Sequence, residues 1–263
     1  MSSSTPAQEP DPAPDPSPPP AGPDRRPWPL LLVGLALVGI LAVAVLTSQD
    51  EAPTMEEPGD AATAPGESEV TDEMRQVGDA LARRDGDDPF ALGDVDAPVV
   101  MIVWSDYHCP YCGQWVRETQ PELVEDYVRS GDLRIEWREF PALGDGSAVL
   151  ARAGYAAGEQ DRFWEFHETY FAEDRQQLTG DDLDEEIAEV ADTAGIDVEQ
   201  LRTDMDTTAA EDHVEHDAQQ GQGIGVSATP AFLVNGEMIM GAQPTPVFME
   251  AIERALDEAE DTP

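Results

Sequence analysis

Apolar residues follow two different patterns along this chain of 263 residues. Residues 30–46 (LLLVGLALVGILAVAVL) form one uninterrupted apolar run, whereas from residue 89 onward the apolar residues occur in short runs bounded by polar turns. Four of the short runs have the length and composition of buried β-strands: residues 98–105, 133–139, 231–234 and 237–240. Asn235-Gly236 separates the last two runs and predicts a hairpin turn between them.

Helices are predicted between and after these strands. A helix over residues 110–129 follows the first strand, a long helical tract runs from about 147 to 220, and a final helix covers about 244–260. Residues 74–84 have weak helical spacing and predict a short helix before the domain. The order β-α-β, a helical block and β-β-α predicts one α/β domain over residues 89–263, with the helical block as an insertion.

The long apolar run sets the organisation of the N-terminal part. Residues 1–27 are rich in Ser, Pro and Asp and predict a disordered leader. Residues 28–47 contain the apolar run and are long enough for one transmembrane helix. Residues 48–88 are acidic and rich in Pro, Gly and Ala, as expected of a flexible tether.

The charges that flank the apolar run predict its orientation. Arg25 and Arg26 precede it, and no basic residue follows it until Arg75. The positive-inside rule therefore places the N-terminus in the cytoplasm and the folded domain outside, as a single-pass protein of the cell membrane. A cleaved signal peptide is the alternative, because it also begins with positive charge and an apolar stretch. Both interpretations export the domain to a compartment in which disulfides persist.

The chain is strongly acidic. It has 56 Asp and Glu residues against 14 basic ones, all of them Arg, and a formal net charge of -42. A surface of this sign repels phosphate backbones, which excludes nucleic-acid binding as a function class. Compositional bias with a highly soluble surface explains the acidity, and so does adaptation to high salt, where screening relieves the self-repulsion.

The only two cysteines, Cys109 and Cys112, stand where the first strand gives way to a helix. At a helix start, unpaired N–H groups and the macrodipole lower the pKa of the first thiol, and Pro110 suits the first turn. Cys109 is therefore predicted to form mixed disulfides and Cys112 to resolve them. The alternatives are a structural disulfide, two unrelated thiols, or a zinc or copper site with His108, for which no second C/H pair supplies a fourth ligand.

Three segments carry a family resemblance. Residues 98–112 (PVVMIVWSDYHCPYC) look like the active-site strand and turn of DsbA-like thiol–disulfide oxidoreductases of the thioredoxin superfamily. Residues 225–236 (GVSATPAFLVNG) resemble the segment with that family's cis-proline, and residues 162–171 (RFWEFHETYF) are similar to a helix of its inserted domain. The resemblance covers about residues 89–260 and implies a thioredoxin-like fold with an inserted helical domain.

The resemblance also implies an activity and partners. The expected reaction is oxidation of cysteines in exported proteins, with a membrane quinone-linked reoxidant as redox partner and with no cofactor or metal. A disulfide reductase or isomerase that uses the same dithiol is the alternative. By analogy, Thr229-Pro230 is a cis peptide that faces the cysteines and pairs with an extended substrate, whereas propensity alone favours an ordinary trans proline.

Residues beside the cysteines are expected to tune them. Pro110 and Tyr111 lie between the two thiols; His108 either stabilises the thiolate as an imidazolium or faces solvent as a neutral ring. Asp106 is expected to cap the turn. The family commonly buries a carboxylate six residues before the first cysteine, but Val103 stands there, so water or another carboxylate has to take the proton of Cys112.

Two further groups have a simple structural interpretation. His213 and His216 lie three residues apart on a predicted helix, which permits a shared metal but fits a solvated acidic helix face better. Five aromatic residues have near-helical spacing and are expected in the core of the insertion, with a peptide groove as a second possibility: Phe163, Trp164, Phe166, Tyr170 and Phe171.

Overall fold

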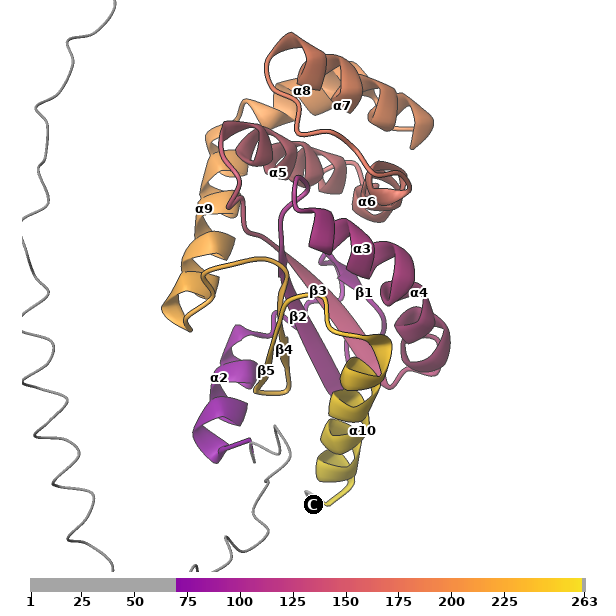
Figure 1. Cartoon of the computed structure of the whole chain (residues 1–263), viewed down its shortest axis with the longest axis vertical. Coiled ribbons are helices and arrows are strands. Elements are labelled where there is room, and N and C mark those ends of the chain that lie inside the picture. The colour runs from indigo at the N-terminus through magenta and orange to yellow at the C-terminus, as the bar shows by residue number, and fades with distance from the viewer. Residues whose placement is uncertain (1–69, 262–263) are drawn as a thin grey trace, which may run out of the picture. The chain divides into compact units, whose positions relative to one another are not determined.

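The computed structural model describes residues 70–261 of the protein. The predicted leader, the predicted membrane anchor over 28–47 and most of the predicted tether lie outside these residues. Within the described range, none of the helices combines the length and the apolar character that a membrane crossing requires. The described residues form an α/β fold in which helices cover both faces of one mixed sheet (Figure 1).

The sheet contains all four predicted strands. They are β2 (Val99–Ser105), β3 (Leu133–Glu139), β4 (Ala231–Val234) and β5 (Glu237–Met240). A fifth strand, β1 (Ala91–Leu92), was not predicted because two residues are too short to show a period. The strand order is β1-β3-β2-β4-β5; β2 and β3 are parallel, and the other pairs are antiparallel.

The hairpin between β4 and β5 turns at the predicted Asn-Gly pair. Asn235 has φ 42° and Gly236 has φ 99°, so both central residues adopt the left-handed conformation that a two-residue hairpin loop requires. Asn235 also ties the hairpin to β2, because its backbone N–H donates to the carbonyl oxygen of Val100 at 3.2 Å.

The single helix predicted over residues 110–129 is wrong: three shorter segments replace it. They are α3 (Pro110–Glu118), α4 (Gln120–Leu123) and the π-helical turn η1 (Val124–Val128). Pro121 has no N–H to donate to a carbonyl four residues earlier, which interrupts the hydrogen-bond ladder after Glu118. The helical hydrogen-bond pattern resumes at Thr119, whose carbonyl oxygen accepts from the backbone N–H groups of Glu122 and Leu123 at 3.1 and 3.2 Å.

The predicted helical tract between β3 and β4 is confirmed as a bundle of five helices. They are α5 (Asp145–Gly158), α6 (Phe163–Phe171), α7 (Asp181–Thr193), α8 (Val198–Met205) and α9 (Thr208–Gly223). The final helix, α10 (Thr245–Asp261), also agrees with the prediction. Trp164 of the aromatic group in α6 is partly buried. The other four side chains are buried in the core, as expected: Phe163, Phe166, Tyr170 and Phe171.

The two faces of the sheet have different cores. On one face, side chains from β2 and β3 pack against α3, α10 and the insertion, and this core includes both cysteines, Trp115, Trp137 and Phe248. On the other face, Trp104 and its neighbours on β2 and β4 pack under α2 (Asp72–Leu81) and α9. We call these the cysteine face and the arginine face.

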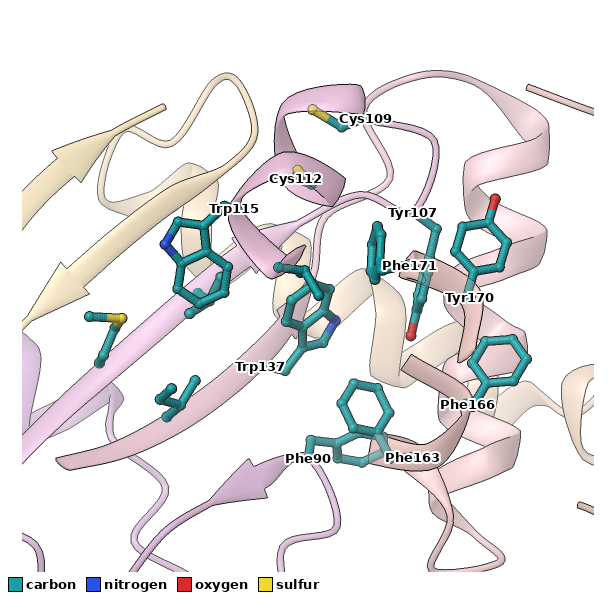
Figure 2. Close-up of a cluster of buried hydrophobic side chains, with 14 of the residues drawn as sticks. Phe90, Tyr107, Cys109, Cys112, Trp115, Trp137, Phe163, Phe166, Tyr170 and Phe171 are labelled. Atoms are coloured by element: carbon teal, nitrogen blue, oxygen red, sulfur yellow. The ribbon is translucent and has the colours of Figure 1, made fainter. Parts of the chain in front are cut away.

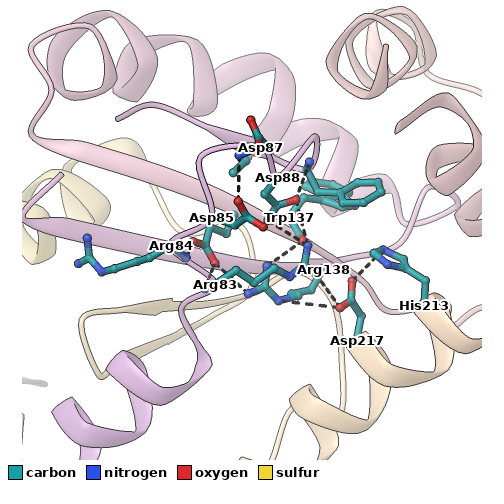
Figure 3. A network of polar contacts seen from close by, with 12 residues as sticks. Arg83, Arg84, Asp85, Asp87, Asp88, Trp137, Arg138, His213 and Asp217 are labelled. Carbon is teal, nitrogen blue, oxygen red and sulfur yellow. Dashed lines mark hydrogen bonds and ion pairs between the residues drawn. The ribbon is translucent and has the colours of Figure 1, made fainter. Parts of the chain in front are cut away.

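The arginine face carries buried charges (Figure 3). Alternate residues of β3 point toward it, and Glu136 accepts from Arg134 Nε at 3.0 Å and from Arg138 Nη2 at 2.9 Å. Asp217 of α9 accepts from Arg83 Nη2 at 2.7 Å. All of these charges except Arg83, whose side chain is 22% exposed, are nearly inaccessible to solvent. Together they connect the segment after α2 to β3 and α9.

The folded domain begins before residue 89. The helix predicted near 74–84 is α2, and instead of belonging to a tether it packs on the β4–β5 hairpin. A side chain at Gly78 would lie 2.9 Å from the backbone nitrogen of Gly236, so the two segments touch along their backbones. Arg75 pairs with Glu258 of α10 at 2.9 Å. The predicted tether boundary thus misses a helix that completes the arginine face.

Candidate active site

The two cysteines lie at the N-terminus of α3, above the cysteine-face core (Figure 2). β2 ends at Ser105, Cys109 is the N-cap of α3, and Pro110 occupies the first helical position, as the sequence predicted. The Cys109 side chain is 6% exposed, whereas Cys112 is fully buried. Tyr111 between them is 64% exposed, so solvent and any partner approach the pair from the Cys109 side.

Cys109 is an acidified thiol. Its pKa falls to about 6 because hydrogen bonds from the Cys112 side chain, the Thr229 side chain and the backbone N–H groups of Cys112 and Tyr111 stabilise the thiolate, although burial opposes them. The protonated sulfur has one competing contact, a hydrogen bond to the carbonyl oxygen of Thr229 at 3.4 Å. The pKa falls despite that contact, so a large share of Cys109 is thiolate at neutral pH.

Cys112 has the opposite environment. Burial raises the pKa of its thiol well above the ordinary value, and the neighbouring Cys109 raises it further. The Ser105 side chain and the backbone N–H of Asp106 lower it by a smaller amount. The pair therefore consists of one thiol that ionises readily and one that stays protonated, and both are free cysteines in this structure.

The loop before β4 faces the cysteines. Thr229-Pro230 is a cis peptide, which confirms the geometry expected from the family resemblance. The loop is held by a hydrogen bond from the backbone N–H of Gly241 to the carbonyl oxygen of Pro230 at 2.8 Å. Its contact with Cys109 through the Thr229 carbonyl places a backbone segment beside the Cys109 sulfur, and its role in substrate binding stays a prediction.

Asp106 organises the approach to α3, as predicted. Its Oδ1 accepts from the backbone N–H of His108 at 2.8 Å, and its Oδ2 accepts from Ala142 and Leu143 at 2.7 and 3.0 Å. These hydrogen bonds connect the turn that carries Cys109 to the loop after β3.

His108 is neither a charged ring that stabilises the thiolate nor a neutral ring that faces solvent, the two alternatives that the sequence suggested. It does not face solvent, because it is 7% exposed and packs against Gly146, where an added Cβ would lie 2.6 Å from its ring. Burial lowers the pKa of His108, with Asp106 and Glu186 opposing the shift, so the neutral ring is favoured over an imidazolium. The thiolate of Cys109 is stabilised without a charged His108.

A cleft of about 280 Å³ opens beside Cys109. Its walls come from the cysteine turn and from α6 with the loop that follows, including Tyr170 and Phe171. Arg117 crosses the floor, donating to the carbonyl oxygen of Phe171 at 3.1 Å and pairing with Asp174. Part of the aromatic group therefore borders the cleft as well as filling the core.

Comparison with known proteins agrees with this geometry. A family model described as Thioredoxin matches residues 85–258. The chain belongs to the thioredoxin family.

Thioredoxin-family relatives indicate the branch. "Probable disulfide bond formation protein D" of Bacillus cereus is 29% identical over 173 residues, 64% of this chain and 77% of the relative. "Disulfide bond formation protein D" of Bacillus subtilis is 29% identical over 170 residues, 63% of this chain and 76% of the relative. The crystal structure of oxidised BdbD from Bacillus subtilis superposes with a TM-score of 0.59 at 26% identity, covering 64% and 92% of the two chains. This thioredoxin-family chain is a DsbA-like thiol–disulfide oxidoreductase.

The two histidines of α9 do not form a pair. His213 packs between the rings of Phe90 and Tyr155, at centroid distances of 4.5 and 5.0 Å, and its Nε2 lies 3.5 Å from Asp217. His216 is exposed. The solvated face expected for both is therefore wrong for His213. Across residues 70–261, no three His, Cys, Asp or Glu side chains gather as metal ligands would.

Sequence reasoning missed three buried polar residues on the cysteine face: Ser105, Tyr107 and Glu139. Each is buried, and each has a side-chain oxygen without a hydrogen-bond partner among the described residues. Glu139 ends a strand in which apolar and charged residues alternate, and only the β2–β3 register, which pairs it with Ser105, reveals that it lies near the site.

Proposed function

We propose that this protein is a membrane-anchored, extracytoplasmic enzyme that oxidises cysteines of exported proteins through a Cys109–Cys112 disulfide. Cys109 is the exchanging sulfur, Cys112 is the resolving sulfur, and Thr229-Pro230 supports the bound substrate strand. Pro110 and Tyr111, which lie between the two cysteines, tune the pair. The proposal places the N-terminus in the cytoplasm and the domain outside, held by the apolar segment 28–47.

The pKa difference between the two thiols carries the proposal. A thiolate that is stabilised on Cys109 favours the reduced pair, so the disulfide form readily gives up its bond to a substrate. Cys109 is also the better leaving group when the substrate closes its own disulfide. The names of the Bacillus relatives, which describe disulfide bond formation, support the same direction.

The proposed reaction balances within the two sulfurs and the substrate. A substrate thiolate attacks the Cys109 sulfur, so a mixed disulfide forms and the Cys112 sulfur leaves. The second substrate thiolate then attacks the substrate sulfur of that bond, which forms the substrate disulfide and releases Cys109 as a thiolate. Two electrons pass from the substrate to the cysteine pair. A membrane quinone-linked partner would remove them and restore the disulfide.

The deciding experiment is the redox potential of the full-length protein, measured together with the thiolate absorbance of Cys109. A potential near -120 mV supports the oxidase, and one near -270 mV would make the chain a reductase. The thiolate should appear with a midpoint at about pH 6. An ordinary thiol pKa of about 8.5 would contradict the assignment.

Cys109→Ser is expected to abolish peptide oxidation, because Cys112, the other member of the pair, is fully buried and does not reach a substrate. Cys112→Ser is the matched control. Its Cys109 thiolate should still attack a substrate disulfide, which forms a mixed disulfide and releases one substrate thiolate, but the variant should not complete a cycle. Mass spectrometry of the trapped adduct distinguishes the two variants. Full activity of Cys109→Ser would reject the proposed roles.

A further inference from the structure

Thiol–disulfide exchange changes the proton count on Cys112. When the disulfide opens, this sulfur leaves as a thiolate, yet its environment strongly favours the thiol. A proton has to reach a fully buried atom, and Val103 occupies the strand position from which a carboxylate was expected. The proton therefore has to come from another group on the cysteine face.

Ser105 lies beside Cys112 on that face, and Glu139 is its neighbour on the next strand. They are paired directly in the parallel register of β2 and β3, so their side chains leave the sheet on the same side. Both residues are 1% exposed. The Ser105 hydroxyl has no formal hydrogen-bond partner among the described residues, yet it is near enough to the Cys112 sulfur to lower the pKa of that thiol.

Glu139 is a carboxyl group with unused hydrogen-bonding capacity. Oε1 accepts from Trp137 Nε1 at 3.1 Å, whereas Oε2 has no partner among the described residues. The backbone of α5 closes over it at Gly154, where an added Cβ would lie 2.9 Å from Glu139 Oε1 and 2.7 Å from Tyr107 Oη. An acid enclosed in this way without a cationic partner in hydrogen-bond contact is held in its neutral form.

We propose that Glu139 is the proton reservoir for Cys112 and that the Ser105 hydroxyl relays the proton between them. When the disulfide opens, the Cys112 thiolate takes the Ser105 hydroxyl proton, and Ser105 takes the proton of Glu139. This leaves a thiol on Cys112 and a carboxylate on Glu139, which regains its proton from solvent. When Cys112 attacks a mixed disulfide, the same transfer runs in reverse. No electrons move in this step.

Several charged and titratable groups bear on Glu139 from the surrounding elements. The carboxyl pKa is raised well above its usual range by burial and then by the negative charge of Asp217, and the effect of Asp106 has the same sign. Trp137 and Arg83 act in the opposite direction. The Tyr107 hydroxyl is itself buried, and its pKa is raised, so it stays protonated beside the acid.

The test compares full-length variants at the step that opens the disulfide. The oxidised proteins are mixed with dithiothreitol in a stopped-flow instrument, and the reduction rate is followed by tryptophan fluorescence between pH 5 and 9. Glu139→Gln should slow the reaction at least about tenfold at pH 8. The deficit should shrink toward pH 5, where solvent supplies protons, and Ser105→Ala should reproduce this pH dependence.

Glu136→Gln is the matched control, because it changes a buried glutamate of the same strand on the opposite face. It should lower stability but leave the pH profile of the rate unchanged. The thiolate midpoint of Cys109 should stay near about pH 6 in Glu139→Gln. Infrared difference spectra should also show a protonated carboxyl band that changes between the oxidised and reduced wild type and is absent from Glu139→Gln.

Two results would overturn the proposal: a rate of Glu139→Gln within twofold of wild type at every pH, or a deficit that is equal at all pH values. The inference depends on disulfide exchange at the pair but not on its direction. A reductase-like potential with the pH-dependent deficit would reject only the proposed oxidase. An oxidase-like potential without the deficit would reject only the role of Glu139.

Discussion

Glu136 and Glu139 lie three residues apart on β3, both are almost completely buried, and their carboxyl groups are shifted in opposite directions. At Glu136, burial on its own would raise the pKa, but the backbone N–H of Arg83 and the charge of Arg138 outweigh it and hold the pKa at about 2. At Glu139, burial prevails and the pKa is raised well above the usual range.

The comparison shows that the partners, and not the depth, decide the charge of a buried acid. On the arginine face, backbone N–H groups and two guanidinium groups satisfy both oxygens of Glu136. Arginine stays charged at any accessible pH, so this pairing is permanent. On the cysteine face, Glu139 has a single indole donor. The same side chain therefore serves as a structural anion on one face and as an exchangeable acid on the other.

The largest expected effect comes from neutralising the anion. Glu136→Gln keeps the shape of the side chain but leaves Arg134 buried without its counter-ion and leaves Arg138 with only Asp217, at 3.9 Å. We expect the free energy of unfolding to fall by roughly 3–5 kcal/mol, as urea titration would measure. A loss below about 1 kcal/mol would mean that the network is not held by Glu136.

A smaller effect is expected from filling the space above Glu139. Gly154→Ala places a methyl group against Tyr107 Oη and Glu139 Oε1 at distances that require the core to shift. The expected loss is about 1–3 kcal/mol in the free energy of unfolding. Gly223→Ala in α9 is the control, because nothing lies within 4 Å of the new Cβ. Equal melting temperatures for the two variants would contradict the tight packing over Glu139.

A third effect appears as a slope with pH and sharpens the contrast in charge. Below an unfolded-state pKa of about 4.3, Glu139 holds a proton in both states. Above it the unfolded chain ionises while the folded protein keeps its proton, so this acid lowers stability as pH rises. Glu139→Gln should therefore gain stability relative to wild type, by up to about 1.4 kcal/mol per pH unit above 4.3 until the folded acid ionises.

The contribution of Glu136 to the free energy of unfolding changes with pH in the opposite direction. Its folded pKa of about 2 lies below the unfolded value, so its contribution is complete above about pH 4.3 and is lost as pH falls through about 2. Urea titrations of both Gln variants from pH 3 to 7 measure the two slopes. Parallel lines for Glu139→Gln and wild type would show that Glu139 ionises normally in the folded protein.

The sequence was sufficient for the parts of the fold that depend on local pattern. The strand over residues 133–139 has the predicted ends because Leu133, Ile135 and Trp137 alternate with charged residues and a glycine turn precedes it. Cys109 and Pro110 occupy the predicted N-cap and first helical positions because their chemistry matches a helix start. Asn235-Gly236 forms the predicted turn because both residues readily adopt the left-handed conformation that the turn requires.

The remainder depends on contacts between distant segments. The alternating charges Arg134, Glu136 and Arg138 look like a solvent-facing side of β3, and only the packing of α9 and of the segment after α2 buries them. Ser105 and Glu139 are 34 positions apart in sequence, and the parallel pairing of their strands alone brings them together. His108 was misjudged because Gly146, on a separate helix, covers its ring.

The position of α2 separates the N-terminal end of the described domain from its reactive cysteines. This helix packs on the hairpin turn, beside the start of β2, whereas the cysteines follow the end of β2, one strand of seven residues away, or roughly 20 Å (Figure 1). The first described helix therefore joins the domain at the end remote from Cys109. A substitution that loosens α2 should accordingly disturb the hairpin and the arginine face before it reaches the surroundings of the two thiols.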